Sequence, residues 1–276
     1  MSAFNELNKL GLVGMAILIG ALQARAEEST HKDAKESPSD LLRLEAGFDY
    51  STGKYGTPSR VSDLELSTTA TYLHGPYTLE VTLPYLRQKA PPGVIVIRGR
   101  PVFQQVPAAN AKSNTVDGEG DIVASLTRLL FDQDDGHPAF DVGVEEKFGT
   151  ASSRKGLGTG KNDYSLKADM WKEWDKFSLS VTTGYTYIGK PAGVQHINNV
   201  FFGTLDGAYK LTANNALGMM LDGSQAAFPG SAPAADVQLY LDSNVTRRSK
   251  LHIYGLKGLK DGSPAWGGGA SIALEF

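Results

Sequence analysis

The chain has 276 residues, a formal net charge of −3 and 41% apolar residues, with 27 basic and 30 acidic side chains. This composition excludes a collagen-like or disordered chain, and the absence of a basic excess argues against a nucleic-acid partner. The sequence contains no cysteine, which excludes disulfide frameworks, thiolate zinc sites and cysteine nucleophiles.

The first residues have the layout of an export signal. A short apolar run over residues 11–22 follows a basic residue and ends before Ala24-Arg25-Ala26, which places small residues where a signal peptidase cleaves. The run is too short for a membrane-spanning helix, which needs about 20 apolar residues, and no later stretch approaches that length. We predict a signal peptide over residues 1–26 and a flexible, polar mature N-terminus over residues 27–39.

Residues 40–276 alternate between apolar and polar side chains with a period of two. In residues 42–50, apolar side chains take the even positions and polar residues or glycine take the odd ones, which is the pattern of a strand with two unlike faces. The pattern recurs about twelve times, weakly in the ninth segment, at lengths that suit tilted strands crossing a bilayer. The alternating segments are 42–50, 63–72, 79–85, 121–126, 140–148, 164–170, 178–187, 205–211, 217–221, 236–242, 251–253 and 270–276.

The connections between these segments alternate between short and long. The short links are 74–76, 132–137, 173–176, 212–215 and 243–248, and the long ones are 51–60, 87–119, 150–163, 189–200 and 222–235. Short turns at one rim and long loops at the other are typical of bacterial outer-membrane barrels. A soluble β-sandwich or lipocalin-like barrel also alternates, but has no reason to keep that rhythm.

The sequence therefore predicts an all-β protein, a transmembrane antiparallel up-and-down β-barrel of about 12 strands with both termini periplasmic. Ten strands remain the alternative, because the ninth segment is weak. The last strand must pair with the first, because lipid cannot satisfy an open sheet edge.

Aromatic residues gather at both predicted rims, as in the interfacial girdles of membrane barrels. The predicted periplasmic girdle holds Tyr72, Phe140, Phe177, Tyr209 and Phe276, and the predicted outer girdle holds Tyr50, Tyr85, Phe148, Tyr164, Tyr185 and Tyr187. An aromatic residue such as Phe276 after an alternating strand resembles the signal read by the barrel assembly machinery, which we expect as a partner together with outer-membrane lipid.

Polar residues on the face opposite the apolar stripe are predicted to line a pore. The interior of a twelve-stranded barrel is wider than side chains alone need to fill, so polar residues there imply water, ion pairs or both. The candidate pore-lining residues are Arg43, Glu45, Asp63, Glu65, Glu80, Asp121, Glu145, Lys147, Lys167, Asp169, Asp206, Lys210, Asp236, Gln238 and His252. Acids outnumber bases in this set, so we expect an open pore to disfavour anions.

The long segment 87–119 carries the run Val94-Ile95-Val96-Ile97, followed by Arg98 and Arg100. It can fold into the mouth as a constriction or form an extracellular hairpin, and its apolar run can meet a hydrophobic solute. The sequence leaves these alternatives open.

Motifs for catalysis, phosphate binding and metal binding are missing or incomplete. The run Gly156 to Lys161 has three residues between its outer glycines and lacks the Ser or Thr of a phosphate loop. The histidines have no metal-ligand spacing, so we expect neither a metal nor a cofactor. His252 could serve a Ser/His barrel hydrolase, but the local signature of such an enzyme is absent.

Several short glycine motifs resemble those of the outer-membrane barrels called the MetA-pathway-of-phenol-degradation family. They are Gly118-Glu119-Gly120-Asp121, Phe148-Gly149-Thr150, the run from Gly156 to Lys161, Asp163-Tyr164 and Gly267-Gly268-Gly269. Phe148 departs from the proline common in such proteins at that position. The resemblance covers residues 40 to the end and implies an outer-membrane channel for hydrophobic or aromatic compounds.

The functional expectation is a non-enzymatic channel of the bacterial outer membrane, for passive uptake or efflux of small molecules, with hydrophobic or aromatic compounds as the candidate class. The alternatives are a structural or adhesive barrel with a salt-bridged, closed lumen and, third, the barrel hydrolase.

Overall fold

A computed structural model describes residues 40–103, 111–191, 194 and 196–276 of the chain. The predicted signal peptide (1–26) and flexible N-terminus (27–39) lie outside the described residues. The described residues form a β-barrel with one short 3-10 helix, Ser153–Lys155, in an outer loop. No helix in these ranges is long and apolar enough to cross a bilayer.

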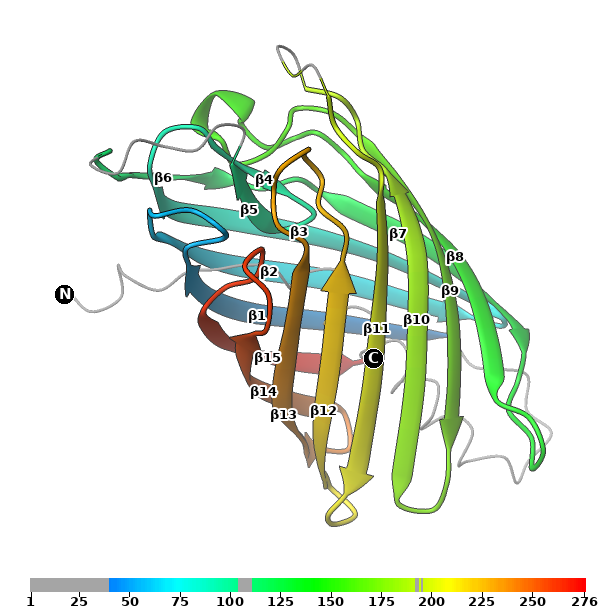
Figure 1. The fold of residues 1–276 in the computed structure, drawn as a ribbon. Helices are drawn as coiled ribbons and strands as arrows, with labels where there is room; N and C mark the ends of the chain where they lie inside the picture. Colours follow the sequence, from blue (N-terminus) through cyan, green and yellow to red (C-terminus); the bar gives the residue numbers. More distant parts are fainter. Residues whose placement is uncertain (1–39, 104–110, 192–193, 195) are drawn as a thin grey trace.

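The barrel wall is an antiparallel sheet in which each strand pairs with its neighbour along the chain (Figure 1). Both β6 and β7 pair with β3, so they form one interrupted strand, and the wall is a closed barrel of 12 strands. This confirms the predicted fold, and the ten-strand alternative is wrong. The wall consists of β1 (Leu41–Gly53), β2 (Val61–His74), β3 (Tyr77–Ala90), β6 (Asn114–Glu119), β7 (Val123–Phe131), β8 (Ala139–Lys147), β9 (Asp163–Glu173), β10 (Phe177–Tyr187), β11 (Val200–Lys210), β12 (Asn215–Ser224), β13 (Ala234–Thr246), β14 (Ser249–Gly258) and β15 (Trp266–Glu275).

Pairing between β1 and β15 closes the barrel. Their register runs from Arg43 opposite Glu275 to Thr52 opposite Trp266. At the end of the seam, the Phe276 N–H donates to the Leu42 carbonyl at 2.9 Å. The predicted pairing of the last strand with the first is therefore confirmed, and the sheet has no free edge between them.

The strands are longer than the alternation indicated, most of all around the predicted loop 87–119. β3 continues to Ala90, and the strand formed by β6 and β7 begins already at Asn114, its cross-strand partner. Treating all of 87–119 as one loop was therefore wrong, because prolines and glycines in the middle of the segment obscured the alternation at its ends. The link 243–248 is also shorter than predicted, since β13 reaches Thr246 and β14 starts at Ser249.

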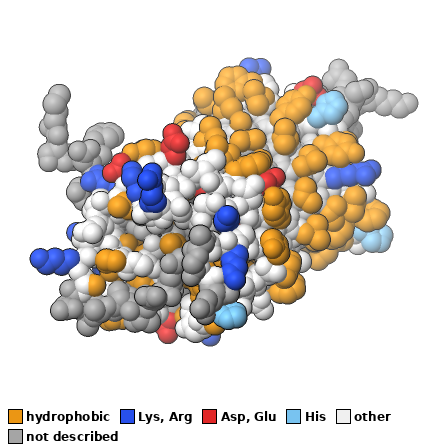
Figure 2. Space-filling view, turned by 90° about the horizontal axis from the view of Figure 1, so that it is seen from above, with side chains coloured by type: hydrophobic (Ala, Val, Ile, Leu, Met, Phe, Trp, Pro, Cys, Tyr) orange, Lys and Arg blue, Asp and Glu red, His pale blue; other side chains and the backbone are white. Residues whose placement is uncertain are grey.

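The outer surface of the wall is apolar. Leucine, valine and other apolar side chains on alternate strand positions are exposed, for example Leu166 at 62% and Leu205 at 43%. Figure 2 shows such side chains gathered over the side of the barrel. A soluble protein rarely exposes so large a continuous apolar surface, whereas a hydrocarbon solvent favours it.

Aromatic side chains border this apolar belt at both ends of the strands. At the rim with long loops, Tyr185 packs on Phe201 with ring centroids 4.6 Å apart, and Tyr50 packs on Trp266 at 5.3 Å. At the other rim, Trp174 stacks on Phe177 at 5.6 Å. Rings with one apolar and one polar side suit the membrane–water interface, so the two predicted girdles correspond to the two ends of the belt.

A charge placed in the middle of the belt should destabilise the barrel. Leu205 lies near the centre of β11, opposite Val181 and Leu221. We expect Leu205→Arg to lower the free energy of unfolding in lipid vesicles by about 2–4 kcal/mol, measured by urea titration. The matched control is Leu211→Arg just beyond the strand end, for which about 0–1 kcal/mol is expected. Equal effects of the two changes would contradict the bilayer-spanning assignment.

Candidate pore and its constriction

The inner face of the barrel is polar and largely buried. Of the predicted pore-lining residues, nine are buried: Arg43, Asp63, Glu65, Glu80, Lys147, Lys167, Asp169, Asp236 and Gln238. Five are half-buried: Glu45, Asp121, Glu145, Asp206 and His252. Lys210 is exposed at the end of β11, 3.5 Å from Glu173. The alternation within each strand thus places these side chains on the face of the strand opposite the apolar belt.

Several of these charged side chains form ion pairs with inward-facing side chains of neighbouring strands. Lys167 Nζ lies 2.9 Å from Glu145, and Lys147 Nζ lies 2.9 Å from Asp121 and 3.1 Å from Asp163. Arg43 pairs with Glu275 at the β1–β15 seam. Removing one partner of such a buried pair typically costs about 3–5 kcal/mol, because it leaves an uncompensated charge.

A hairpin from the segment between β3 and β6 lies in the mouth of the barrel at the long-loop rim (Figure 1). Its strands β4 (Val94–Ile97) and β5 (Arg100–Phe103) form a two-stranded sheet separate from the wall. Of the alternatives that the sequence left open, the structure shows a hairpin folded into the mouth.

Apolar contacts seat this hairpin on opposite sides of the mouth. Ile95 and Ile97 belong to a buried cluster with Ile188 and Val200, at the outer ends of β10 and β11, and with Phe228 of the β12–β13 loop. Val94 and Phe103 belong to a second buried cluster that contains Tyr55 and Val61. The Val-Ile-Val-Ile run lacks alternation because all four residues are buried.

Arg100 ties the hairpin to the wall by two ion pairs. Its guanidinium lies 2.6 Å from Asp222 on β12 and 2.7 Å from Asp236 on β13. These aspartates are direct cross-strand partners, a placement in which like charges repel unless a cation lies between them. Although burial opposes the charge of Arg100, Asp236 and Asp222 raise the pKa of its guanidinium above the usual range.

Arg98 lies at the tip of the hairpin and contacts a different part of the wall. Its guanidinium carbon lies 3.9 Å from the centre of the Phe202 ring, a cation–π contact. Its Nη1 donates to the Thr186 hydroxyl and, at 3.5 Å, to the Ser165 hydroxyl. Arg98 and Gly99 both have positive φ angles, 49° and 69°, as a two-residue type I′ turn requires.

The glycine-rich loop before β9 supports the hairpin from outside. The Val96 N–H donates to the Gly156 carbonyl at 3.1 Å. A Cβ on Gly156 would lie 2.4 Å from the Val94 carbonyl oxygen, and its φ of 76° also favours glycine. The glycine here permits close approach to the hairpin, which explains one of the motifs singled out in the sequence.

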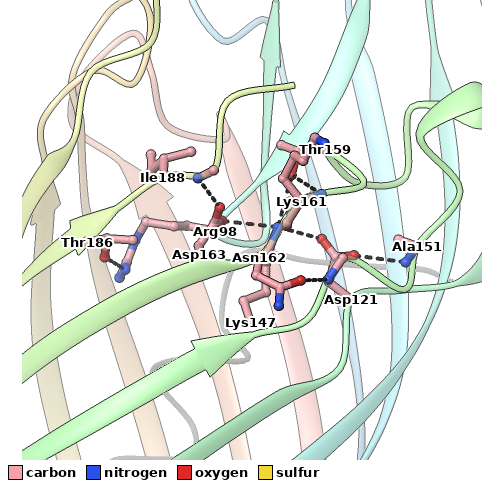
Figure 3. Close-up of polar contacts among 12 residues, drawn as sticks. Arg98, Asp121, Lys147, Ala151, Thr159, Lys161, Asn162, Asp163, Thr186 and Ile188 are labelled. Carbon is pink, nitrogen blue, oxygen red and sulfur yellow. Dashed lines mark hydrogen bonds and ion pairs between the residues drawn. The ribbon is translucent and has the colours of Figure 1, made fainter. Parts of the chain in front are cut away.

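Residues of the other glycine motifs, except Gly267-Gly268-Gly269 on β15, meet in a polar network around Lys147 (Figure 3). Asp121 accepts the Ala151 N–H at 2.8 Å and pairs with Lys147, which also donates to the Thr159 hydroxyl. Asp163 pairs with Lys147 and accepts the Gly189 N–H at 2.9 Å. This network joins the β8–β9 and β10–β11 loops to the interruption between β6 and β7.

A second lumen feature combines apolar and aromatic side chains. Met220, Tyr240, Tyr254 and Leu256 form a buried cluster on the inner faces of β12 to β14. The Tyr240 ring covers Gly218, where a Cβ would come within 2.0 Å of it. The Tyr240 hydroxyl donates to Asp206 at 3.0 Å.

His252, the residue weighed for a hydrolase, lies between these tyrosines. Its Nδ1 is 2.7 Å from Asp242, and its ring lies 5.2 Å from Tyr240 and 5.6 Å from Tyr254. Among the described residues, no group of three or more acidic or histidine side chains is arranged to hold a metal ion.

Sequence reasoning missed the residues that fix the constriction. Asp163 and Asp222 were assigned to loops, although both lie at strand ends and face inward. Tyr240 and Tyr254 have inward parity in β13 and β14, but aromatics were considered only for the rims. Extending the alternation by one residue in β9 and in β12 would have found the two aspartates.

Comparison with known proteins shows that the fold is similar to solved structures but does not assign the chain to a family. No family model matches the sequence, and no curated protein matches it. The COG4313 outer membrane channel from Pseudomonas putida F1 superposes with a TM-score of 0.69 at 14% identity, over 89% of this chain and 98% of that one. The NanC porin (TM-score 0.49, 12% identity, 85% and 98% coverage) and the CymD monoaromatic hydrocarbon channel (0.45, 12%, 87% and 89%) are more distant.

The similarity to the COG4313 channel shows the fold of an outer-membrane β-barrel and does not confirm the MetA-pathway family. Together with the closed sheet and the apolar belt, the fold places the chain in the bacterial outer membrane.

Loss of the Arg100 ion pairs should release the hairpin. The cysteine-free chain allows a single reporter, Ile95→Cys, at a buried hairpin position that is 7% exposed. We expect Arg100→Ala in this background to raise the rate of labelling by a water-soluble maleimide at least about tenfold, since two facing carboxylates lose their cation. Arg154→Ala, which changes an exposed arginine of an outer loop, should leave the rate unchanged. Equal labelling of Arg100→Ala and the parent would show that the ion pairs do not hold the hairpin.

Proposed function

We propose that the protein is a passive outer-membrane channel for small molecules, in which the β4–β5 hairpin forms the constriction. The observation that carries this proposal is that the element in the mouth is a separate two-stranded sheet, which the described residues attach to the wall through side chains and loop contacts. Such an element can move without breaking the wall sheet. The polar inner face supports a water-compatible path behind it.

Hydrophobic or aromatic compounds are the proposed solute class. The Met220–Tyr240–Tyr254–Leu256 cluster offers an apolar and aromatic surface on the lumen wall, with hydroxyl and carboxylate groups at its edge. The apolar residues of β4 lie at the mouth. A small aromatic molecule can bury its ring on such surfaces while water stays in contact with the polar groups.

The second candidate is a structural barrel with a permanently closed lumen. It is favoured by the buried ion pairs of Lys167 with Glu145 and of Lys147 with Asp121 and Asp163, which cross-link neighbouring strands. The two candidates differ in whether the barrel conducts.

The two ends of the chain are proposed to act in export and assembly. We propose that residues 1–26 direct export and that the barrel assembly machinery recognises β15 and Phe276. Phe276 is 61% exposed at the short-turn rim, which supports its accessibility.

Removing the hairpin should increase conductance. Because Ala90 and Asn114 are cross-strand partners, residues 91–113 can be replaced by a short Gly-Asn-Gly turn without disturbing the wall. We expect a severalfold rise in single-channel conductance in planar bilayers, since the constriction is removed. Insertion of Gly-Ser into the opposite-rim turn 133–136 serves as control and should change nothing. If neither the parent nor the hairpin-free protein conducts, the channel proposal fails and the closed barrel is favoured.

The conductance should favour cations over anions. Acidic residues exceed basic ones along the inner face, including Glu45, Glu80, Asp169 and Asp206 besides the paired carboxylates. Rings of negative charge in a narrow path attract cations and repel anions. A KCl gradient across the bilayer should therefore give a reversal potential of the sign set by potassium. A clear chloride preference would contradict this assignment of the pore lining.

A further inference from the structure

The two arginines of the hairpin have opposite electrostatic surroundings. Arg100 lies between two aspartates at 2.6 and 2.7 Å. Arg98, two residues away, contacts two hydroxyls and an aromatic ring. Within the described part of the chain, Arg98 makes no ion pair. Arg100 thus pairs directly with two carboxylates, whereas Arg98 interacts with Glu145, Asp222 and Asp163 only at longer range.

The carboxylates nearest to Arg98 already have other partners. Glu145 accepts from Lys167 at 2.9 Å. Asp163 pairs with Lys147 at 3.1 Å and accepts the Gly189 N–H. Figure 3 shows Arg98 directed toward Thr186, while Asp163 lies in the network of Lys147. Burial lowers the pKa of Arg98, which reflects the cost of holding this cation away from water.

The backbone at Arg98 is unfavourable for this residue. A type I′ turn places both central residues in the left-handed region, where Asn-Gly is strongly preferred. Arg98 adopts a φ of 49° there, which is less favourable for arginine than for asparagine or glycine. Stability of the turn alone does not account for an arginine at its tip, whereas a role for the guanidinium does.

We propose that Arg98, together with Phe202 and the hydroxyls of Thr186 and Ser165, forms a binding site for a small aryl carboxylate at the mouth. This inference deepens the proposed channel function, because it names a solute class for the same constriction.

The geometry supplies both parts of such a ligand with partners. The hydrogen bonds described for Arg98 involve Nη1, so Nη2 and Nε are the donors available to a carboxylate, which guanidinium groups bind in a bidentate manner. The half-buried Phe202, next to the guanidinium, gives the ring of the ligand a surface to pack on. Arg98 is a cation at the entrance of an acid-rich lumen, so it can attract a carboxylate there.

The test uses the full-length protein in detergent and benzoate as the probe, with calorimetric titration at low salt. Benzyl alcohol and benzylamine, which share the ring but are neutral and cationic, are the comparison ligands. We expect benzoate to bind best and Arg98→Asn to weaken its binding by about tenfold or more, since a charge-assisted bidentate pair is lost. Arg98→Lys should recover only part of the affinity, because a lysine cannot form the bidentate pair.

Two controls separate binding from folding. Arg154→Asn removes an exposed arginine outside the mouth and should leave benzoate affinity unchanged. Arg98→Asn places a residue favoured by the turn, so its barrel should keep its heat-modifiable migration on gels. The buried reporter Ile95→Cys should stay protected in this variant.

Each result decides between the two proposals. Benzoate binding that is absent in the parent, equal in Arg98→Asn, or matched by benzylamine overturns the aryl carboxylate site. If the parent conducts but does not bind benzoate, the site fails and the channel stands. If the parent binds benzoate through Arg98 but neither it nor the hairpin-free protein conducts, the channel fails and the site stands.

Discussion

Hydrocarbon offers no hydrogen-bond partner to a backbone N–H or C=O group, and the rest of this structure depends on that constraint. A sheet in lipid must close on itself, so β1 and β15, from opposite ends of the barrel sequence, pair along their whole length. Closure in turn fixes which side chains face outward, because neighbours along a strand point to opposite faces. The apolar belt and the polar lumen are two consequences of one alternating pattern.

Closing 12 strands creates an interior that the wall's own side chains must fill, pair or leave to water. The protein fills its outer mouth with an inserted hairpin, which presents apolar residues to two clusters and arginines to the polar wall. The hairpin needs support because it is not part of the wall sheet. Close packing of Gly156 against Val94 and the ion pairs of Arg100 provide it from opposite sides.

Alternation predicted the barrel and its strand number, because lipid imposes the same two-residue pattern on every spanning strand. It could not predict the hairpin, since Val94 to Ile97 are all buried and show no alternation. Asp222 and Asp163 were missed because the predicted alternating segments ended one residue short of each of them. Which of the inward-facing charged side chains come into contact depends on the register of the strands and on the path of the loop that carries the hairpin. Local periodicity specifies neither.

The two arginines of one turn illustrate how position alone decides the role of a residue type. Arg100 belongs to a strand of the hairpin and reaches two aspartates that would repel each other without it, so its charge contributes to the structure. Arg98 occupies the strained tip, where its charge is met by hydroxyls and the face of Phe202. The surroundings of Arg98 therefore differ from those of Arg100, although both belong to the same hairpin. Within three residues, the hairpin combines one arginine that is paired with two carboxylates of the wall and one that is held by hydroxyls and an aromatic ring.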